Sequence, residues 1–219
     1  MRRTMRFFAA SIAALCLAAA LFFDVRPADA AAMASLDAVQ IVQAIQETGE
    51  NADLIAQIEN TYAAAKKRAK RKSFKGKCGA YVNHQLVILG INQKYIGANG
   101  NREYDIYCKC AESTGGYAIT AYGARQYTLQ SALEAIAKED AHARNILIGF
   151  QKGTSKAGKK YGHTLLIHGI ENGMVYFSDS FAQKVDGKKY KEGAPIVCSI
   201  ATFAKLYKKY KLDGVIWFH

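Results

Sequence analysis

Hydrophobic residues recur at intervals of three and four along several stretches of the chain, which is the spacing of one face of an α-helix. In one such stretch, Leu54, Ile58 and Tyr62 form a single apolar stripe. Thr128 and Ser199 directly precede two others, and both residue types are favourable N-caps. This periodicity predicts helices at residues 36–47, 51–71, 78–89, 128–143 and 200–211.

From Asn145 onward the pattern changes to short runs of β-branched and aromatic residues that are bounded by turn residues. These runs predict strands at residues 145–150, 158–170, 173–180, 195–197 and 214–218. Glu171-Asn172-Gly173 is a hairpin signal between two of them. Residues 92–127 predict a loop with one or two short strands. Helices followed by antiparallel strands predict an α+β fold in which a helix packs on a sheet.

The first 30 residues have the features of a secretory signal peptide. Arginines at positions 2, 3 and 6 precede a short apolar run, and Ala28-Asp29-Ala30 forms an A-x-A cleavage site. The run is short for a membrane span. We therefore expect cleavage and a secreted or envelope protein without stable membrane insertion. Behind the signal peptide (1–30), the sequence predicts a helical spacer or pro-segment (31–72) and the main domain (73–219).

The chain is strongly basic, with a net charge of +12 that becomes +10 when residues 1–30, with four arginines and two aspartates, are removed. Such a charge suits an anionic partner outside the cell, although solubility alone is an alternative explanation. Six of the seven residues from Lys66 to Lys72 are basic. The signal peptide argues against nucleic acid as the partner of this run. We expect the run to lie outside the main domain and to hold a monomer on anionic envelope polymer.

Four cysteines remain after cleavage: Cys78, Cys108, Cys110 and Cys198. If Cys78 stays a free thiol, at most one disulfide forms, and the spacing of Cys108 and Cys110 is too tight for a bridge between them. A bridge from Cys198 to either of these two stays open. No second ligand pair stands at a zinc-like spacing, so we expect neither a metal nor a cofactor.

Cys78 stands at the start of the third predicted helix. Its neighbours Gly76 and Gly79 have no side chain that would shield the thiol from solvent. Positive charge nearby comes from Lys75 and Lys77. A helix N-terminus and nearby cations lower the pKa of a thiol and make it nucleophilic. An ordinary buried cysteine is the alternative interpretation, but this setting favours a nucleophile.

His163 is the predicted base, because it opens a strand after a basic, Gly-rich loop and so suits the rim of a cleft. His168 lies five positions further along the strand and faces the other side of the sheet. His84 is six positions past Cys78, about 240° around the helix, and points away from the thiol. The remaining two histidines lie at a polar helix end and at the C-terminus.

The register of the hairpin decides which residue orients the imidazole. If all of Glu171-Asn172-Gly173 forms the loop, Asp179 lies diagonal to His163 on the same face. A turn of only the last two residues would shift the register by one and place Ser178 and Ser180 there. A carboxylate stabilises imidazolium better than a hydroxyl does. Asp179 is therefore the predicted third catalytic residue, and Ser180 is the alternative. A purely structural interpretation is that Asp179 caps a turn at the end of the strand.

Two segments resemble the CHAP family of cysteine amidases and peptidases, within the NlpC/P60-like, papain-like superfamily. They are C-G-A-Y-V-N-H-Q-L-V-I-L-G and ILIGF…YGHTLLIHGIENGMVYFSDS, within residues 74–90 and 145–180. The resemblance implies a cysteine-bearing helix on an antiparallel sheet, with Cys78, His163 and Asp179 as the catalytic residues. The chain lacks the Asp-Cys-Ser-Gly motif and the glutamine that papain-like proteases place before the cysteine. The long separation of Cys78 from His163 predicts an insertion around residues 92–145.

Together these features predict a secreted cysteine hydrolase, and the resemblance implies cell-wall peptidoglycan as the substrate. One alternative is a secreted thiol protease for which residues 31–72 are a pro-region. Another is a non-catalytic wall-binding module on a degenerate hydrolase fold.

Overall fold

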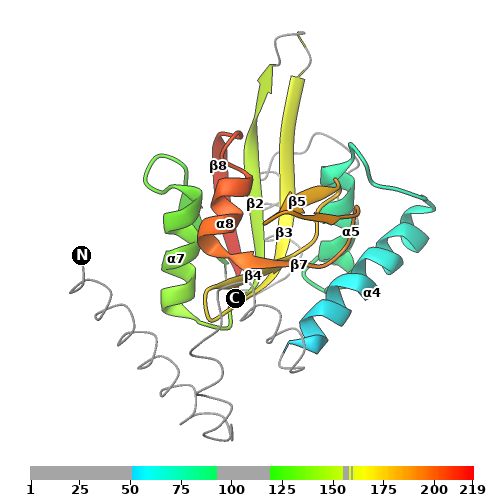
Figure 1. The fold of residues 1–219 in the computed structure, drawn as a ribbon, viewed down its shortest axis with the longest axis horizontal. Coiled ribbons are helices and arrows are strands. Elements are labelled where there is room, and N and C mark those ends of the chain that lie inside the picture. Colours follow the sequence, from blue (N-terminus) through cyan, green and yellow to red (C-terminus); the bar gives the residue numbers. More distant parts are fainter. Residues whose placement is uncertain (1–50, 93–118, 155–157, 159) are drawn as a thin grey trace, which may run out of the picture. The chain divides into compact units, whose positions relative to one another are not determined.

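The computed structural model describes residues 51–92, 119–154, 158 and 160–219 (Figure 1). They build a six-stranded sheet in the order β1-β8-β2-β3-β4-β7, in which every neighbouring pair is antiparallel. The strands are β1 (Ile119–Gly123), β2 (Arg144–Thr154), β3 (Lys160–Glu171), β4 (Met174–Phe177), β7 (Ile196–Ser199) and β8 (Leu212–Phe218). The helices are α4 (Ala52–Ala69), α5 (Cys78–Ile88), α7 (Leu129–Glu139) and α8 (Ile200–Leu206). The predicted α+β class is confirmed.

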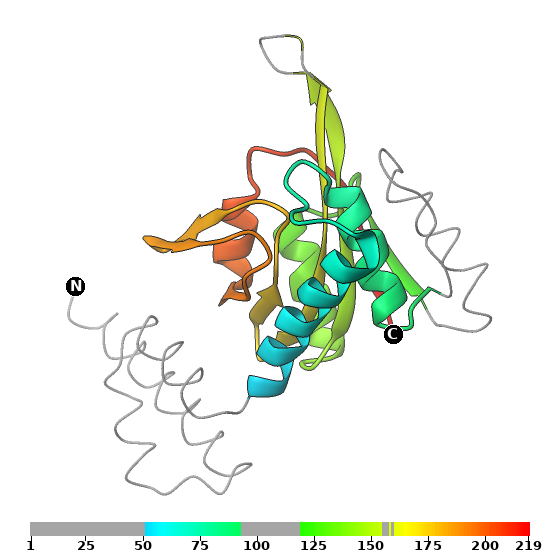
Figure 2. The same ribbon diagram turned by 90° about the vertical axis from the view of Figure 1, so that its right-hand side faces the viewer.

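Helices cover both faces of the sheet, as the two views in Figure 1 and Figure 2 show. Helix α5 packs on one face, and α7 and α8 pack on the other. The alternation of side chains along β2 explains the two layers, since Ile146 and Ile148 join the cluster of α7 whereas Leu147 joins that of α5. The cysteine-bearing helix therefore does pack on the sheet.

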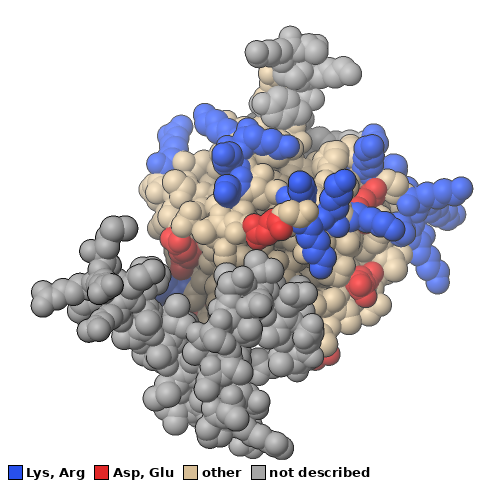
Figure 3. Space-filling view, in the orientation of Figure 1, with Lys and Arg blue, Asp and Glu red and all other residues tan. Residues whose placement is uncertain are grey.

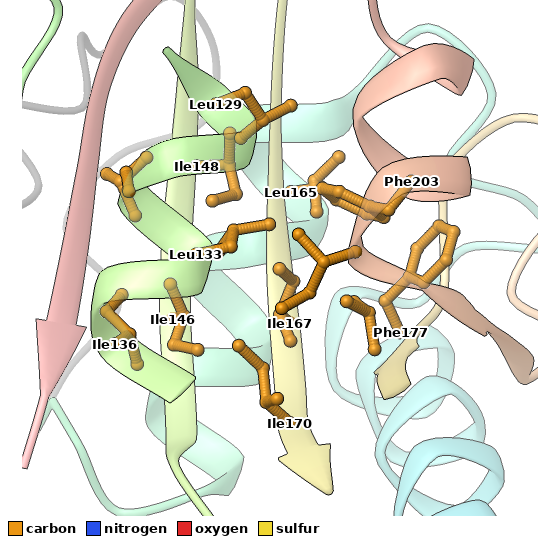
Figure 4. Packing of buried hydrophobic residues seen from close by; sticks show 14 of the residues in the cluster. Leu129, Leu133, Ile136, Ile146, Ile148, Leu165, Ile167, Ile170, Phe177 and Phe203 are labelled. Carbon is orange, nitrogen blue, oxygen red and sulfur yellow. The ribbon is translucent and has the colours of Figure 1, made fainter. Parts of the chain in front are cut away.

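The larger core lies under α7 and α8. Leu129, Leu133 and Ile136 of α7 lie over Ile146 and Ile148 of β2 (Figure 4). Full burial of one such side chain contributes roughly 1.5–3 kcal/mol. This core fixes β2 and, through it, the neighbouring strand β3 that carries the predicted base.

Helix α4 packs against the sheet through the apolar stripe that the sequence indicates. Leu54 and Ile58 are buried against Tyr176 of β4 and Val197 of β7. The compact unit spans residues 52–219. Helix α4, which precedes the boundary predicted at Ser73, thus packs in the same compact unit as the sheet, because its stripe has a partner there.

The caps of two helices are as predicted. Thr128 accepts from the backbone N–H of Ser131 at the start of α7, and Ser199 accepts from that of Thr202 at the start of α8. Both helices end earlier than predicted, at Glu139 and Leu206. After Leu206 the chain forms turns that place two tyrosines inward and lysines outward.

A small second sheet was not predicted. It consists of β5 (Gln183–Val185) and β6 (Lys188–Tyr190), joined by a turn in which Asp186 and Gly187 have φ values of +45° and +84°. An Asp-Gly pair with two positive φ angles is typical of a tight hairpin. The strands are short and mostly polar, so they lack the alternation by which longer strands are recognised.

Several predictions lie outside the described residues, namely the signal peptide (1–30), the helix at 36–47 and the cysteines Cys108 and Cys110. Within the described part of the chain, no helix combines the length and apolar character that crossing a membrane requires.

Candidate active site

Cys78 is the first residue of α5 and is partly exposed. Gly76 precedes it with a φ of +72°, a conformation that glycine adopts without strain, and turns the chain into the helix. Burial raises the pKa of the thiol. Hydrogen bonding and charge interaction with His163 lower it, as do the backbone N–H groups of Thr164 and Gly79. These effects outweigh burial, and the net pKa lies below its ordinary value.

His163 lies in β3 and is 3% exposed. Its Nε2 atom is 3.1 Å from Oδ2 of Asp179. Its Nδ1 atom makes no well-formed hydrogen bond among the described residues, and the Cys78 thiol lies close enough to the ring to raise its pKa. Burial lowers the pKa of His163, but hydrogen bonds with Asp179 and Cys78 outweigh it and raise the pKa to about 9. Of the three predicted residues, His163 and Asp179 are thus in direct contact, and Cys78 lies close enough for its pKa and that of His163 to affect one another.

Asp179 is 1% exposed and has several donors. Its Oδ2 atom accepts from Gln183 Nε2 at 2.6 Å and from the hydroxyl of Tyr207 at 2.5 Å, in addition to its contact with His163. Its Oδ1 atom accepts from the backbone N–H of Phe181 at 3.1 Å. Burial raises the pKa of the carboxyl, whereas these partners lower it, and the net shift is downward. Asp179 is therefore held as a carboxylate.

The turn between β3 and β4 is one residue shorter than the three-residue loop from which Asp179 was predicted. Glu171 pairs with Met174, and Asn172 and Gly173 alone form the turn, with φ values of +50° and +80°. The assumption of a three-residue loop is therefore wrong. Asn and Gly tolerate positive φ, which explains the two-residue turn.

A bulge in β3 reverses the effect of this turn. The register shifts by one residue between Gly169 and Ile167, so Ile167 pairs with Phe177. Beyond the bulge, the pairing is the one that a three-residue loop would have produced. Asp179, two residues past Phe177, therefore contacts His163. Without the bulge, the two-residue turn would place Asp179 on the opposite face of the hairpin.

Ser178 and Ser180, the alternatives to Asp179, have other hydrogen-bond partners than His163. The hydroxyl of Ser178 lies 2.7 Å from that of Tyr81, and both side chains are buried. This contact joins α5 to the segment that carries Asp179. Ser180 donates a long hydrogen bond of 3.4 Å to Asp179 itself.

Four aromatic rings surround the His163 imidazole. Phe150 lies nearly parallel to it at a centroid distance of 6.2 Å, and Tyr210 stacks on it at 5.6 Å with 28° between the ring planes. Tyr207 stacks at 5.8 Å, and Phe181 is tilted at 5.4 Å. The rings restrict the orientation of the imidazole, so that Nε2 keeps its contact with Asp179.

Glu192, in the segment after β6, binds the chain on both sides of the basic run. Its carboxylate accepts from the hydroxyls of Tyr62 at 3.0 Å and Ser73 at 2.5 Å, and from the backbone N–H of Phe74. The next residue, Gly193, donates its N–H to the carbonyl oxygen of Asp179 at 2.8 Å. The segment that leads into Cys78 is thus tied to the segment that carries Asp179.

The other histidines lie away from the thiol. His168 faces α5, where its Nε2 atom is 2.9 Å from Gln85 Nε2, and burial lowers its pKa to about 4. His142 pairs with Glu171 near the hairpin turn, and His219 stacks on Trp217. The prediction that His168 faces the opposite side from His163 is confirmed.

Cys198 is a buried free thiol in β7, and burial raises its pKa to about 12. Its two candidate disulfide partners lie outside the described residues. Across the described ranges, no group of three or more His, Cys, Asp or Glu side chains is placed to hold a metal ion.

Sequence reasoning missed Gln183, Tyr207 and Glu192. Tyr207 and Glu192 are distant in sequence from the residues that they contact, whereas Gln183 lies four positions after Asp179 and begins an Asp-Gly hairpin, which is a local signal. No family model, curated protein or solved structure matches this chain. Inference about its chemistry therefore rests on the site itself.

Proposed function

We propose that this protein is a cysteine hydrolase that cleaves amide or peptide bonds. The observation that supports this most strongly is the grouping of Cys78, His163 and Asp179, in which the thiol pKa is lowered and the imidazole pKa is raised. Opposite shifts of this kind favour a thiolate and an imidazolium in contact. That pair is the reactive form of a thiol hydrolase.

The proposed reaction has two steps. The Cys78 thiolate attacks the carbonyl carbon, and the backbone N–H of Cys78 contributes to binding the developing oxyanion. His163 donates its proton to the leaving amine, and a thioester forms. In the second step His163 takes a proton from water, the hydroxide attacks the thioester, and the thiolate leaves. Asp179 stays ionised and orients the ring.

We also propose that the core is papain-like. In support, Cys78 lies at the start of a helix that packs on an antiparallel sheet. The histidine comes from β3, and the carboxylate comes from the segment that directly follows the neighbouring strand β4. This arrangement agrees with the CHAP resemblance of residues 74–90 and 145–180.

The proposed substrate is peptidoglycan outside the cytoplasm. The signal-peptide pattern of residues 1–30, the basic charge of the remaining chain and the CHAP resemblance all favour this substrate.

The test is digestion of purified peptidoglycan by residues 31–219, with identification of the new chain ends by mass spectrometry. Cys78→Ala and treatment with iodoacetamide should both abolish the release of fragments, while circular dichroism stays unchanged. Cys198→Ala is the matched control, since this thiol is buried and its pKa is raised, so it should neither react with iodoacetamide nor be needed for activity. Unchanged digestion by Cys78→Ala would refute the proposal.

A further inference from the structure

Two lysine-rich segments adjoin the candidate active site. Residues 183–191, which form the β5–β6 hairpin and its exit, contain four lysines and one aspartate, and residues 205–211 contain four lysines and no acid. All eight lysines are exposed, and we call them the basic rim: Lys184, Lys188, Lys189, Lys191, Lys205, Lys208, Lys209 and Lys211. Figure 3 shows basic side chains gathered over the hairpin and over the end of α8.

The inward residues of these same segments complete the site. Gln183 of β5 donates to Asp179, and so does Tyr207 at the end of α8. Tyr210 stacks on His163. The lysines alternate with these residues along the chain, so the segments that hold the triad also carry the basic rim beside it.

The charge on the hairpin is unfavourable for the protein alone. Lys184 and Lys189 are directly opposite one another in the β5–β6 register. Like charges at opposed positions of a strand pair are destabilising. Lys188, which precedes Lys189 in β6, makes a cation–π contact, with its Nζ atom 5.1 Å from the Tyr190 ring centroid. An anionic ligand over this face would relieve the repulsion.

We propose that the basic rim binds the anionic flank of the substrate, a polymer with carboxylate or phosphate groups close to the bond that is presented to Cys78. The segments that contact Asp179 and His163 bear these lysines, so the basic rim adjoins the site at which the proposed substrate reacts. The identity of the polymer as peptidoglycan rests on the proposed function. The requirement for negative charge does not.

The test measures binding without turnover. Cys78→Ala protein, residues 31–219, is titrated into fluorescent poly-L-glutamate, with polyphosphate in a second arm, and the fluorescence anisotropy is followed at two salt concentrations. Lys184→Gln with Lys189→Gln should weaken binding roughly 5- to 10-fold, as the loss of two exposed ion pairs implies. Stronger binding in one arm identifies carboxylate or phosphate as the preferred group. Raised salt should weaken both arms.

Two further variants make the result specific. Arg125→Gln with Lys138→Gln removes the same charge from the β1–α7 loop and α7, and should change binding less than twofold. Lys184→Glu places opposite charges across the hairpin, so its Tm should stay or rise while binding weakens. Equal losses in the control pair, unchanged binding in the hairpin pair, or a lower Tm for Lys184→Glu would each overturn the inference.

The outcomes separate this inference from the proposed function. A protein that binds through the rim and cuts no amide bond refutes only the proposed function. A protein that digests peptidoglycan but whose hairpin pair binds unchanged refutes only the role of the rim.

Discussion

The hydroxyl of Tyr207 lies 2.5 Å from Oδ2 of Asp179, the same oxygen that His163 contacts. Tyr207 follows α8, which packs on the face of the sheet opposite to α5. Burial and the neighbouring carboxylate raise the pKa of the phenol well above its ordinary value, so it remains a donor at all physiological pH values. The two helical layers therefore meet at the candidate triad, with Cys78 coming from one and this donor from the other.

Tyr207→Phe tests this contact, because it removes the donor and keeps the ring. We expect the free energy of unfolding to fall by about 1.5–3 kcal/mol, the value of a hydrogen bond to a charged group. We also expect kcat to fall with little change in KM, and the alkaline limb of the pH profile to move up, because a carboxylate with one donor fewer attracts imidazolium more strongly. Tyr127→Phe, near β1, is the control and should change neither. An unmoved pH profile would limit Tyr207 to a structural role.

The pH dependence of activity follows from the two shifted pKa values. Activity on an amide substrate should rise as Cys78 loses its proton, below the ordinary thiol pKa, and fall as pH passes about 9, where His163 loses its proton. The raised pKa of His163 also stabilises the fold at low pH. That contribution is complete below the ordinary imidazole pKa and is lost as pH rises through about 9. The measurement is kcat/KM and Tm from pH 5 to pH 10.

Asp179→Asn should move the alkaline limb to lower pH, because an amide does not stabilise the imidazolium as a carboxylate does. The measurement is again the pH profile of kcat/KM, with Ser180→Ala as the neighbouring control. A limb that stays in place would show that Asp179 does not act through His163.

Cys78, His163 and Asp179, which the structure brings together, could be selected as candidates from the sequence because each carries a local signal. The cysteine begins a helix after a glycine turn, and the histidine and aspartate lie on either side of an Asn-Gly hairpin. The reason for choosing Asp179 was nevertheless incomplete. Gly169 is a local signal for the bulge between Ile167 and Gly169, since a glycine inside a strand often marks a bulge, but the glycine alone does not give the register.

Tyr207, Gln183 and Glu192 could not be assigned in the same way. The predicted helix at 200–211 placed Tyr207 on an apolar face, and that pattern is equally consistent with an ordinary core residue. The apolar stripe of α4 predicted a helix correctly. Its docking site on Tyr176 and Val197 required the order of the strands, which hydrophobic periodicity does not contain.

Glu192→Gln should loosen the connection between α4 and the segment leading to Cys78. One carboxylate holds Tyr62, Ser73 and the Phe74 N–H, and an amide has only one accepting oxygen. We expect a loss of about 1–3 kcal/mol in the free energy of unfolding. Burial and Glu192 raise the pKa of Tyr62 to about 12, so its ultraviolet titration should move to lower pH in the variant.

Glu134→Gln on α7 is the control for that experiment. Glu134 is exposed and contacts Gln130 on the same helix, so its replacement should leave stability and the titration of Tyr62 unchanged. A Tyr62 titration that is the same in both variants would contradict the role of Glu192.

Replacing the six basic residues of Lys66–Lys72 with Gln should lower association with cell walls more than turnover of a small soluble substrate. These side chains are exposed or half-exposed at the end of α4, and their field is screened beyond about 8 Å at physiological salt. The measurement is co-sedimentation with walls at low and high salt, beside a soluble amide assay. Equal losses in both assays would place the run within the catalytic unit, to which α4 is packed.

The turn and the bulge in β3 together determine which side chains of the hairpin face His163, and the turn alone does not. One residue added to the Asn172-Gly173 turn would reverse which side chains after β4 meet His163, and straightening the bulge would reverse them again. Either change alone would bring a serine to the ring in place of Asp179, whereas both together would leave the triad intact. Among related chains, turn length and bulge are thus free to vary only as a pair.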